Sequence, residues 1–189
     1  MNQSRKRFFI ALLPPQAVQD NANQIKQHFA DCYDSRAAQK SPPHITLQPP
    51  FDWLAEDMAI LKHPLSEFAL NQAPVPISLE GFAAFPPRVI YINVLKTAQL
   101  LRVQQELMEL METRLGIVDP KSKARPFAPH MTVAFRDLTR QNFKLAWQEF
   151  QSRSLQAEFI VARLTLLIHD GQRWNVCCEF PFLRPDDSA

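Results

Sequence analysis

The sequence predicts an α+β protein built from two structurally similar lobes, each of which presents one histidine-bearing strand to a shared cleft. Short apolar runs typical of strands alternate with segments whose apolar residues recur at helical spacing. The pattern Pro-His-apolar-Thr-apolar occurs twice, at residues 43–47 and 129–133, so that His44 and His130 differ in number by 86. This repetition is the main indication of two related halves.

The same shift of 86 relates other predicted elements. It superposes residues 75–82 on 161–168, and residues 88–93 on 174–179. In each half, the strand with the histidine is followed by a helix and then by a pair of strands. We therefore expect an internal structural repeat within one two-lobed domain that covers residues 1–189.

Four elements are predicted in the first half. They are a strand at 8–13, a helix that begins at 16, a strand at 44–47 and a helix at 58–68. Pro14 and Pro15 stop the first strand, and the helix that follows has apolar residues on one stripe. Proline pairs flank 44–47 on both sides, which suits the two ends of an edge strand. Pro64 should kink or end the last helix.

The remaining elements follow the same logic. They are strands at 75–82 and 89–95, a helix that ends at 115, a strand at 130–135, a helix from 140 to 150, and strands at 159–168 and 174–180. Thr97 and Thr139 precede the two helices as N-caps, and Gly116 follows the first in the favoured C-terminal place. Asp170-Gly171 marks the last turn.

Composition excludes several classes of protein. The chain has only 3 Gly against 16 Pro, so the glycine-rich phosphate loops of P-loop NTPases and dinucleotide enzymes cannot form. No apolar run approaches the ~20 residues needed to cross a membrane, and no signal peptide is recognisable. The net charge of +2 alone does not indicate nucleic-acid binding. Cys32, Cys177 and Cys178 are expected to be reduced thiols, and adjacent cysteines on a strand should face opposite sides. We expect a cytoplasmic protein.

The two repeated motifs are suited to phosphodiester chemistry. On a strand, residues i and i+2 share a face, so His44 lies with Thr46, and His130 with Thr132, while the alternate residues enter the core. One neutral imidazole can deprotonate a nucleophile, and one imidazolium can protonate a leaving oxygen. The threonine hydroxyls can hydrogen-bond the non-bridging phosphate oxygens. Neither histidine has a metal ligand at close spacing, so no metal site and no cofactor are predicted.

These segments resemble the two-histidine phosphoesterases, which include the bacterial RNA 2′,3′-cyclic phosphodiesterases, also called 2′-5′ RNA ligases. The likeness covers Arg7-Phe8-Phe9-Ile10-Ala11-Leu12, His44-Ile45-Thr46-Leu47 with Pro49-Pro50-Phe51, and Arg125-Pro126-Phe127-Ala128-Pro129-His130-Met131-Thr132. The order of elements agrees over nearly the whole chain. One departure is that Phe135 stands where members acting on RNA ends often have arginine, and Arg136 comes one residue later.

The resemblance implies a bilobal α+β fold with a pseudo-twofold axis, in which two antiparallel sheets flanked by helices surround a central cleft. It implies metal-independent hydrolysis of a 2′,3′-cyclic phosphate on RNA or a nucleotide to a 2′-phosphate, together with 2′-5′ ligation in reverse. His44 would donate a proton to the leaving 3′ oxygen, His130 would activate water, and Thr46 and Thr132 would hold the phosphate. Arg125 matches the family pattern and is a candidate for substrate binding.

Other interpretations remain open at this point. The same residues could cleave a 2′-5′ linkage or trim an RNA 3′ end, or the chain could be a nucleotide-binding module without turnover. Lys121, Lys123 and Arg125 form either a solvated loop or a patch that steers a polyanion. The expected partner is an RNA end or a small nucleotide with a cyclic phosphate. A cleft within one chain needs no protein partner, so a monomer is the expectation.

Overall fold

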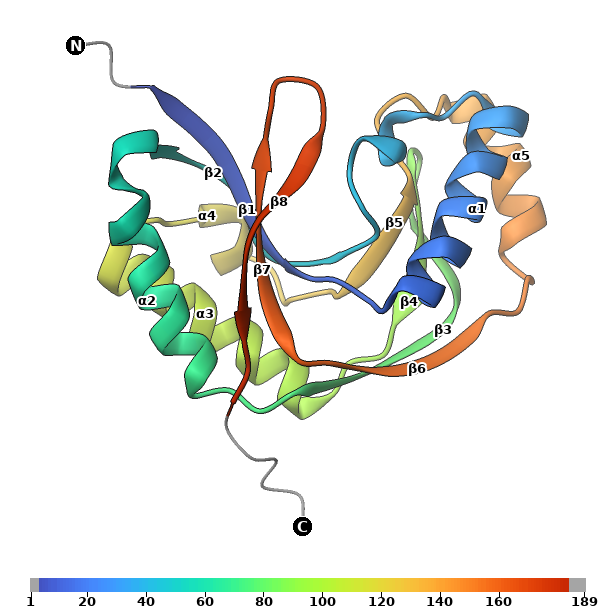
Figure 1. The fold of residues 1–189 in the computed structure, drawn as a ribbon. Helices are drawn as coiled ribbons and strands as arrows, with labels where there is room; N and C mark the ends of the chain where they lie inside the picture. Colours follow the sequence, from blue (N-terminus) through green and yellow to red (C-terminus); the bar gives the residue numbers. More distant parts are fainter. Residues whose placement is uncertain (1–3, 184–189) are drawn as a thin grey trace.

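A computed structural model describes residues 4–183, with the exception of the Ser122 side chain, and consists of two four-stranded antiparallel sheets with helices on their outer faces (Figure 1). The strands are β1 Arg5–Leu12, β2 Ile45–Leu54, β3 Val75–Phe85, β4 Val89–Val94, β5 His130–Ala134, β6 Gln156–Val161, β7 Arg163–His169 and β8 Trp174–Pro181. The helices are α1 Gln16–Tyr33, α2 Met58–Leu70, α3 Ala98–Leu115, α4 Pro120–Lys123 and α5 Arg140–Phe150, with 3₁₀ turns at Ala37–Lys40 and Ala55–Asp57. The predicted α+β class with two antiparallel sheets is confirmed.

The strand orders place one histidine-bearing segment in each sheet, but the predicted equivalence of 88–93 with 174–179 fails, since β4 is an inner strand and β8 an outer one. One runs β2-β1-β7-β8 and the other β5-β4-β3-β6, and all neighbouring strands are antiparallel. The strand after His44 and the strand that begins with His130 are therefore both at a sheet edge. The strand pair that follows each histidine segment joins the sheet of the other histidine, since β3 and β4 pair next to β5, and β7 and β8 next to β1.

The helices are also exchanged between the two sheets. Helix α1 packs against β5, although β1 and β2, which flank it in the chain, both belong to the other sheet. Helix α3 lies against β2 in the same way, although it connects β4 with β5. Figure 1 shows α1 with α5 on one side of the molecule and α2 with α3 on the other. Helices α1 and α3 therefore each connect strands of one sheet while they pack against the other sheet.

The predicted helix caps are confirmed. The Thr97 hydroxyl accepts from the Leu100 amide, and the Thr139 hydroxyl accepts from the Asn142 amide, each at 3.1 Å. Gly116 ends α3 at φ +66°, where a side chain would be strained. These caps fix the start of α3 and α5, and hence the positions of the apolar stripes that cover the two sheets.

Several predicted strands and helices differ from those observed. The single strand expected at 159–168 is two strands, because the chain leaves one sheet at Ala162 and enters the other. The strand expected at 44–47 continues through Pro49-Pro50, where an irregular register between β1 and β2 accommodates the missing amide hydrogens. Helix α2 continues past Pro64 without ending there.

The expectation that Cys177 and Cys178 face opposite sides is wrong. A register shift in β8 near these residues brings their Sγ atoms to 3.6 Å. All three cysteines are free thiols, as expected.

Most buried apolar residues of both sheets and their helices form one continuous cluster, and Phe9, Ala11 and Leu167 form a second, smaller one. Within the described residues, no helix is long and apolar enough to cross a membrane. The boundaries of the predicted domain at 1–189 stay a prediction, and residues 1–3 and 184–189 lie outside the described part. Strands β2 and β5 are in contact. The two histidine-bearing edges, which come from different halves of the chain, therefore lie against one another.

Candidate active site

Each histidine-bearing segment shows the alternation that its sequence predicts. His44 and Thr46 are partly exposed, whereas Ile45 and Leu47 are buried in the core. On β5, His130 and Thr132 are partly exposed, while Met131 and Val133 are fully buried. The apolar residues therefore anchor each edge and leave the polar pair on the opposite face of the strand.

Both imidazole rings are held by the same kind of hydrogen bond. Nδ1 of His44 lies 2.7 Å from the carbonyl oxygen of Pro42, and Nδ1 of His130 lies 2.7 Å from that of Ala128. A carbonyl oxygen only accepts, so Nδ1 carries the hydrogen in both rings. In the neutral ring this leaves Nε2 as the proton-accepting nitrogen, which is the tautomer a general base requires.

Aromatic rings pack beside each imidazole. Phe9 lies 4.7 Å from His44 between ring centroids and also contacts Trp174 at 4.6 Å. On the other side, Tyr91 and Phe85 lie 5.1 and 5.2 Å from His130. These apolar neighbours remove water from one side of each histidine and fix its orientation.

Burial governs the protonation of the two histidines. Loss of water lowers the pKa of His44 to about 4, and the nearby charges of Lys26 and His130 lower it further, while the bond to Pro42 opposes the shift. Burial also lowers the pKa of His130, again opposed by its bond to a carbonyl. The two rings therefore lie within electrostatic range of each other and are neutral near pH 7.

A pocket of about 260 Å³ joins the two edge strands. It is lined by Thr46, Leu47, Pro49, Phe85, Gln104, Lys121, Arg125, Pro126, Phe127, Ala128 and His130. Of the predicted site residues, it brings together Thr46, His130 and Arg125, whereas His44 and Thr132 are not among its lining residues. The cations Lys121 and Arg125 in its lining make the pocket suited to an anion.

Sequence reasoning missed two residues of the pocket. Phe85 follows an apolar strand and gave no signal that distinguishes it from a core residue. Gln104 lies on the helix stripe of α3 between apolar positions, which is a signal for a polar group directed inward. Its amide lies 3.4 Å from the carbonyl oxygen of Leu47, so it meets the strand after His44.

Other residues that the sequence analysis singled out lie outside the pocket. Arg136 adopts φ +62° and covers the Phe135 ring at 5.0 Å, and it is not among the pocket's lining residues. Phe51 is a core residue that stacks on Phe8. Lys123 pairs with Glu112 on α3. Among residues 4–183, no group of three histidine, cysteine or carboxylate side chains is arranged to hold a metal ion.

The chain is similar to known proteins both in sequence and in structure. The model of the 2′-5′ RNA ligase superfamily matches residues 14–173. A Geobacillus kaustophilus protein named "Putative phosphoesterase" is 29% identical over 173 residues, covering 90% of this chain and 92% of its own. A protein of the same name from Geobacillus sp. strain WCH70 is 30% identical over 175 residues, with the same coverage of both chains.

Two solved structures share the fold. Escherichia coli LigT, crystallised with 3′-AMP, has a TM-score of 0.66 at 19% identity and covers 96% of this chain and 100% of its own. A protein from Thermus thermophilus has a TM-score of 0.65 at 21% identity, covering 94% of this chain and 98% of its own. The paired sheets and exchanged strands are therefore an arrangement that these proteins have in common.

Proposed function

The chain belongs to the 2′-5′ RNA ligase superfamily, and from this premise we propose that it is a phosphoesterase that hydrolyses 2′,3′-cyclic phosphate ends of RNA or nucleotides to 2′-phosphates. The curated relatives carry phosphoesterase in their names, which supports this class of chemistry. One observation carries the finer proposal: His44 and His130 stand at two edge strands in contact, each held through Nδ1 by a carbonyl.

In this reaction a water oxygen attacks phosphorus, and the bond from phosphorus to the 3′ oxygen breaks. His130 accepts the proton that the water loses, and His44 gives a proton to the 3′ oxygen, which keeps the bonding electron pair. The division of roles follows the resemblance of the two motifs. After the step, His130 is protonated and His44 is neutral, and exchange with solvent restores the starting state.

Substrate binding favours the uptake from solvent of the proton that the general acid needs. Both histidines have a pKa below the ordinary value because their surroundings shield the rings from water. A phosphodiester anion beside them favours the charged imidazolium and raises both pKa values. Each ring disfavours a charge on the other, so one proton is shared by the pair, which is the state that acid–base catalysis needs.

In this proposal Thr46 and Thr132 provide hydroxyl donors for the non-bridging oxygens, and Arg125 provides a cation in the pocket lining. The same site would join a 5′-hydroxyl to the phosphorus in place of water, which forms a 2′-5′ linkage. The reverse of this joining step cleaves an existing 2′-5′ linkage with the same residues. Cleavage of a 2′-5′ linkage is therefore the second candidate function. Side chains provide all of these steps, so no metal enters the proposal.

The test is product analysis with EDTA present. Purified protein is incubated with a nucleoside 2′,3′-cyclic monophosphate, with a short RNA ending in a cyclic phosphate, and with a 2′-5′ linked dinucleotide. We expect a nucleoside 2′-phosphate end from the first two substrates. A 3′-phosphate product, or dependence of the reaction on added divalent metal, would contradict the proposal, while turnover of the dinucleotide alone would favour the second candidate.

A further inference from the structure

Lys26 is a buried cation that the proposed reaction leaves unused. It lies on α1 among the apolar residues that pack toward β5, and only 1% of its surface is exposed. Its Nζ donates to the carbonyl oxygen of Ser41 at 2.9 Å, which is the one hydrogen bond recorded for it among the described residues. A lysine ammonium has three hydrogens to donate, so this group is buried with incomplete compensation.

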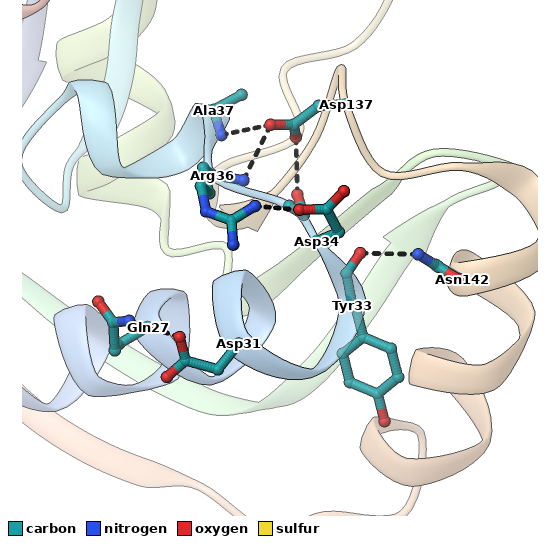
Figure 2. A network of polar contacts seen from close by, with 9 residues as sticks. Gln27, Asp31, Tyr33, Asp34, Arg36, Ala37, Asp137 and Asn142 are labelled. Carbon is teal, nitrogen blue, oxygen red and sulfur yellow. Dashed lines mark hydrogen bonds and ion pairs between the residues drawn. The ribbon is translucent and has the colours of Figure 1, made fainter.

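The carbonyl that Lys26 holds belongs to the segment that leads to His44. Ser41 is followed by Pro42, whose carbonyl in turn accepts from the His44 ring. The start of the same segment is fixed by Asp137, which follows β5: its carboxylate accepts from the Ser35 hydroxyl and from the amides of Arg36 and Ala37, each at 2.8 Å. Figure 2 shows this carboxylate directed at the two amides.

The segment is thus attached at both ends to the half of the molecule that carries His130. Helix α1 packs against β5, and the 3₁₀ turn at Ala37–Lys40 contacts both of them. Lys26 therefore connects the strand of His130 with the approach to His44. A shift of Ser41 would change the position of the His44 ring relative to its partner.

The buried charge of Lys26 affects both the stability of the fold and the protonation of His44. Burial lowers the pKa of Lys26 to about 8, so the folded state holds this proton less tightly than the unfolded chain does, and the charge destabilises the fold at neutral pH. The same charge lowers the pKa of His44. A methionine of similar length would remove the cost, so packing alone does not explain a lysine here.

We propose that Lys26 is a positioning residue of the reaction, whose buried ammonium fixes the Ser41 carbonyl and directs a positive field at His44 and at the phosphate bound beside it. This inference rests on the proposed function for its kinetic part. Its structural part, the action of Lys26 on His44, is independent of the substrate. The field acts in a region with little water, where a charge is weakly screened.

The other charged groups on the elements around α1 do not provide this field. On α5, Glu149 is bound by His28, Tyr33 and Arg153 at the outer end, and Arg140 and Lys144 are exposed. On the 3₁₀ turn, Lys40 is exposed to solvent, and Arg36, just before it, pairs with Asp34. His130 is the ionisable residue of β5, and with Lys26 it makes up the charges that lower the pKa of His44.

The experiment compares Lys26→Met with Lys40→Met in the whole protein. Lys40→Met is a matched control, because it removes a lysine next to Ser41 that is exposed and screened. Three quantities are measured: the pKa of the His44 ring by NMR titration, turnover of a nucleoside 2′,3′-cyclic monophosphate, and the melting temperature. Lys26→Met should raise the His44 pKa, lower kcat/KM by about 10- to 100-fold, and leave the melting temperature unchanged or higher. Lys40→Met should change none of them.

Each result decides one part of the account. An unchanged His44 pKa in Lys26→Met would overturn the field at His44, whether or not the wild type turns over the substrate. Turnover within about twofold of the wild type, or a loss that only follows a fall in melting temperature, would overturn the positioning role. If the wild type itself is inactive on the cyclic phosphate while the His44 pKa rises as expected, the substrate is wrong and the role of Lys26 stands.

Discussion

His44 and His130, which come from different halves of the chain, are held through the same ring nitrogen by the same kind of hydrogen bond. Each Nδ1 donates to the carbonyl two residues earlier at 2.7 Å. The backbone of each approach, Pro42-Pro43 and Ala128-Pro129, therefore sets the tautomer of the ring that follows it. Because the two hydrogen bonds are alike, differences between the two histidines must come from their surroundings, of which Lys26 near His44 is the clearest.

Replacement of either threonine should weaken the reaction without unfolding the protein. Thr46→Val and Thr132→Val keep the shape and the β-branch on an edge strand but remove a hydroxyl donor. We expect kcat to fall by ~10- to 100-fold in each, because a donor to the phosphate oxygens acts mainly where charge develops. Steady-state kinetics with circular dichroism tests this. A rise in KM with unchanged kcat would show instead that the hydroxyls only bind the ground state.

The stability of the protein should fall as the pH drops from about 6.5 toward 4. The unfolded chain binds a proton on each histidine near pH 6.5, whereas the folded protein takes one on His44 only near pH 4. In that window the unfolded state binds more protons, so the free energy of unfolding decreases as the pH falls. Denaturant unfolding at pH 7, 6 and 5 measures the slope.

The control for this slope is His44→Gln, which removes the titrating ring. Its stability should depend less on pH over the same window. The comparison is cleanest above pH 5, because the lowered pKa of Glu149 adds a loss of stability at more acidic values. Equal slopes for the two proteins would mean that His44 is not buried in its neutral form.

Arg125→Gln should weaken the binding of RNA more than the turnover of a mononucleotide. Arg125 and Lys121 are the two cations of the pocket lining, and we expect them to contact further phosphates of a longer substrate. Loss of one phosphate contact should reduce the slope of log affinity against log salt by about one. Fluorescence anisotropy over a salt series measures it, and Arg136→Gln serves as the control, since Arg136 covers Phe135 outside the pocket. The same slope in both variants would argue against a role for Arg125.

Much of the fold could be predicted, because strand alternation and helix caps are local. The two His-x-Thr segments, the Thr97 and Thr139 caps and the edge position of the strand after His44 follow from neighbouring residues alone. The switch at Ala162 could not be predicted, because both sheets accept the same apolar pattern and only the tertiary structure decides which one a strand joins. The bulge at Cys177 is likewise fixed by pairing with β7 and not by its own sequence.

The site was predicted in part. The four His and Thr residues share a motif, and Arg125 stands in a recognisable approach to it. Lys26 was missed although it left a signal: it stands four residues after Ala22 and three before Phe29, inside the apolar stripe of α1. A charged residue in such a stripe is exposed far more often than buried. Its burial depends on a carbonyl from a segment that lies 15 residues away.

The measurement that tests the central claim most directly is turnover of a nucleoside 2′,3′-cyclic monophosphate by four proteins: wild type, His44→Ala, His130→Ala and the double variant. His63→Ala is the control, because His63 lies on the exposed face of α2 beside Glu67. Each single variant should lose roughly 10²- to 10⁴-fold in kcat, and the double variant should lose little more, because the two groups act in one step. Wild-type activity in either single variant, or losses that multiply in the double variant, would contradict a shared acid–base pair.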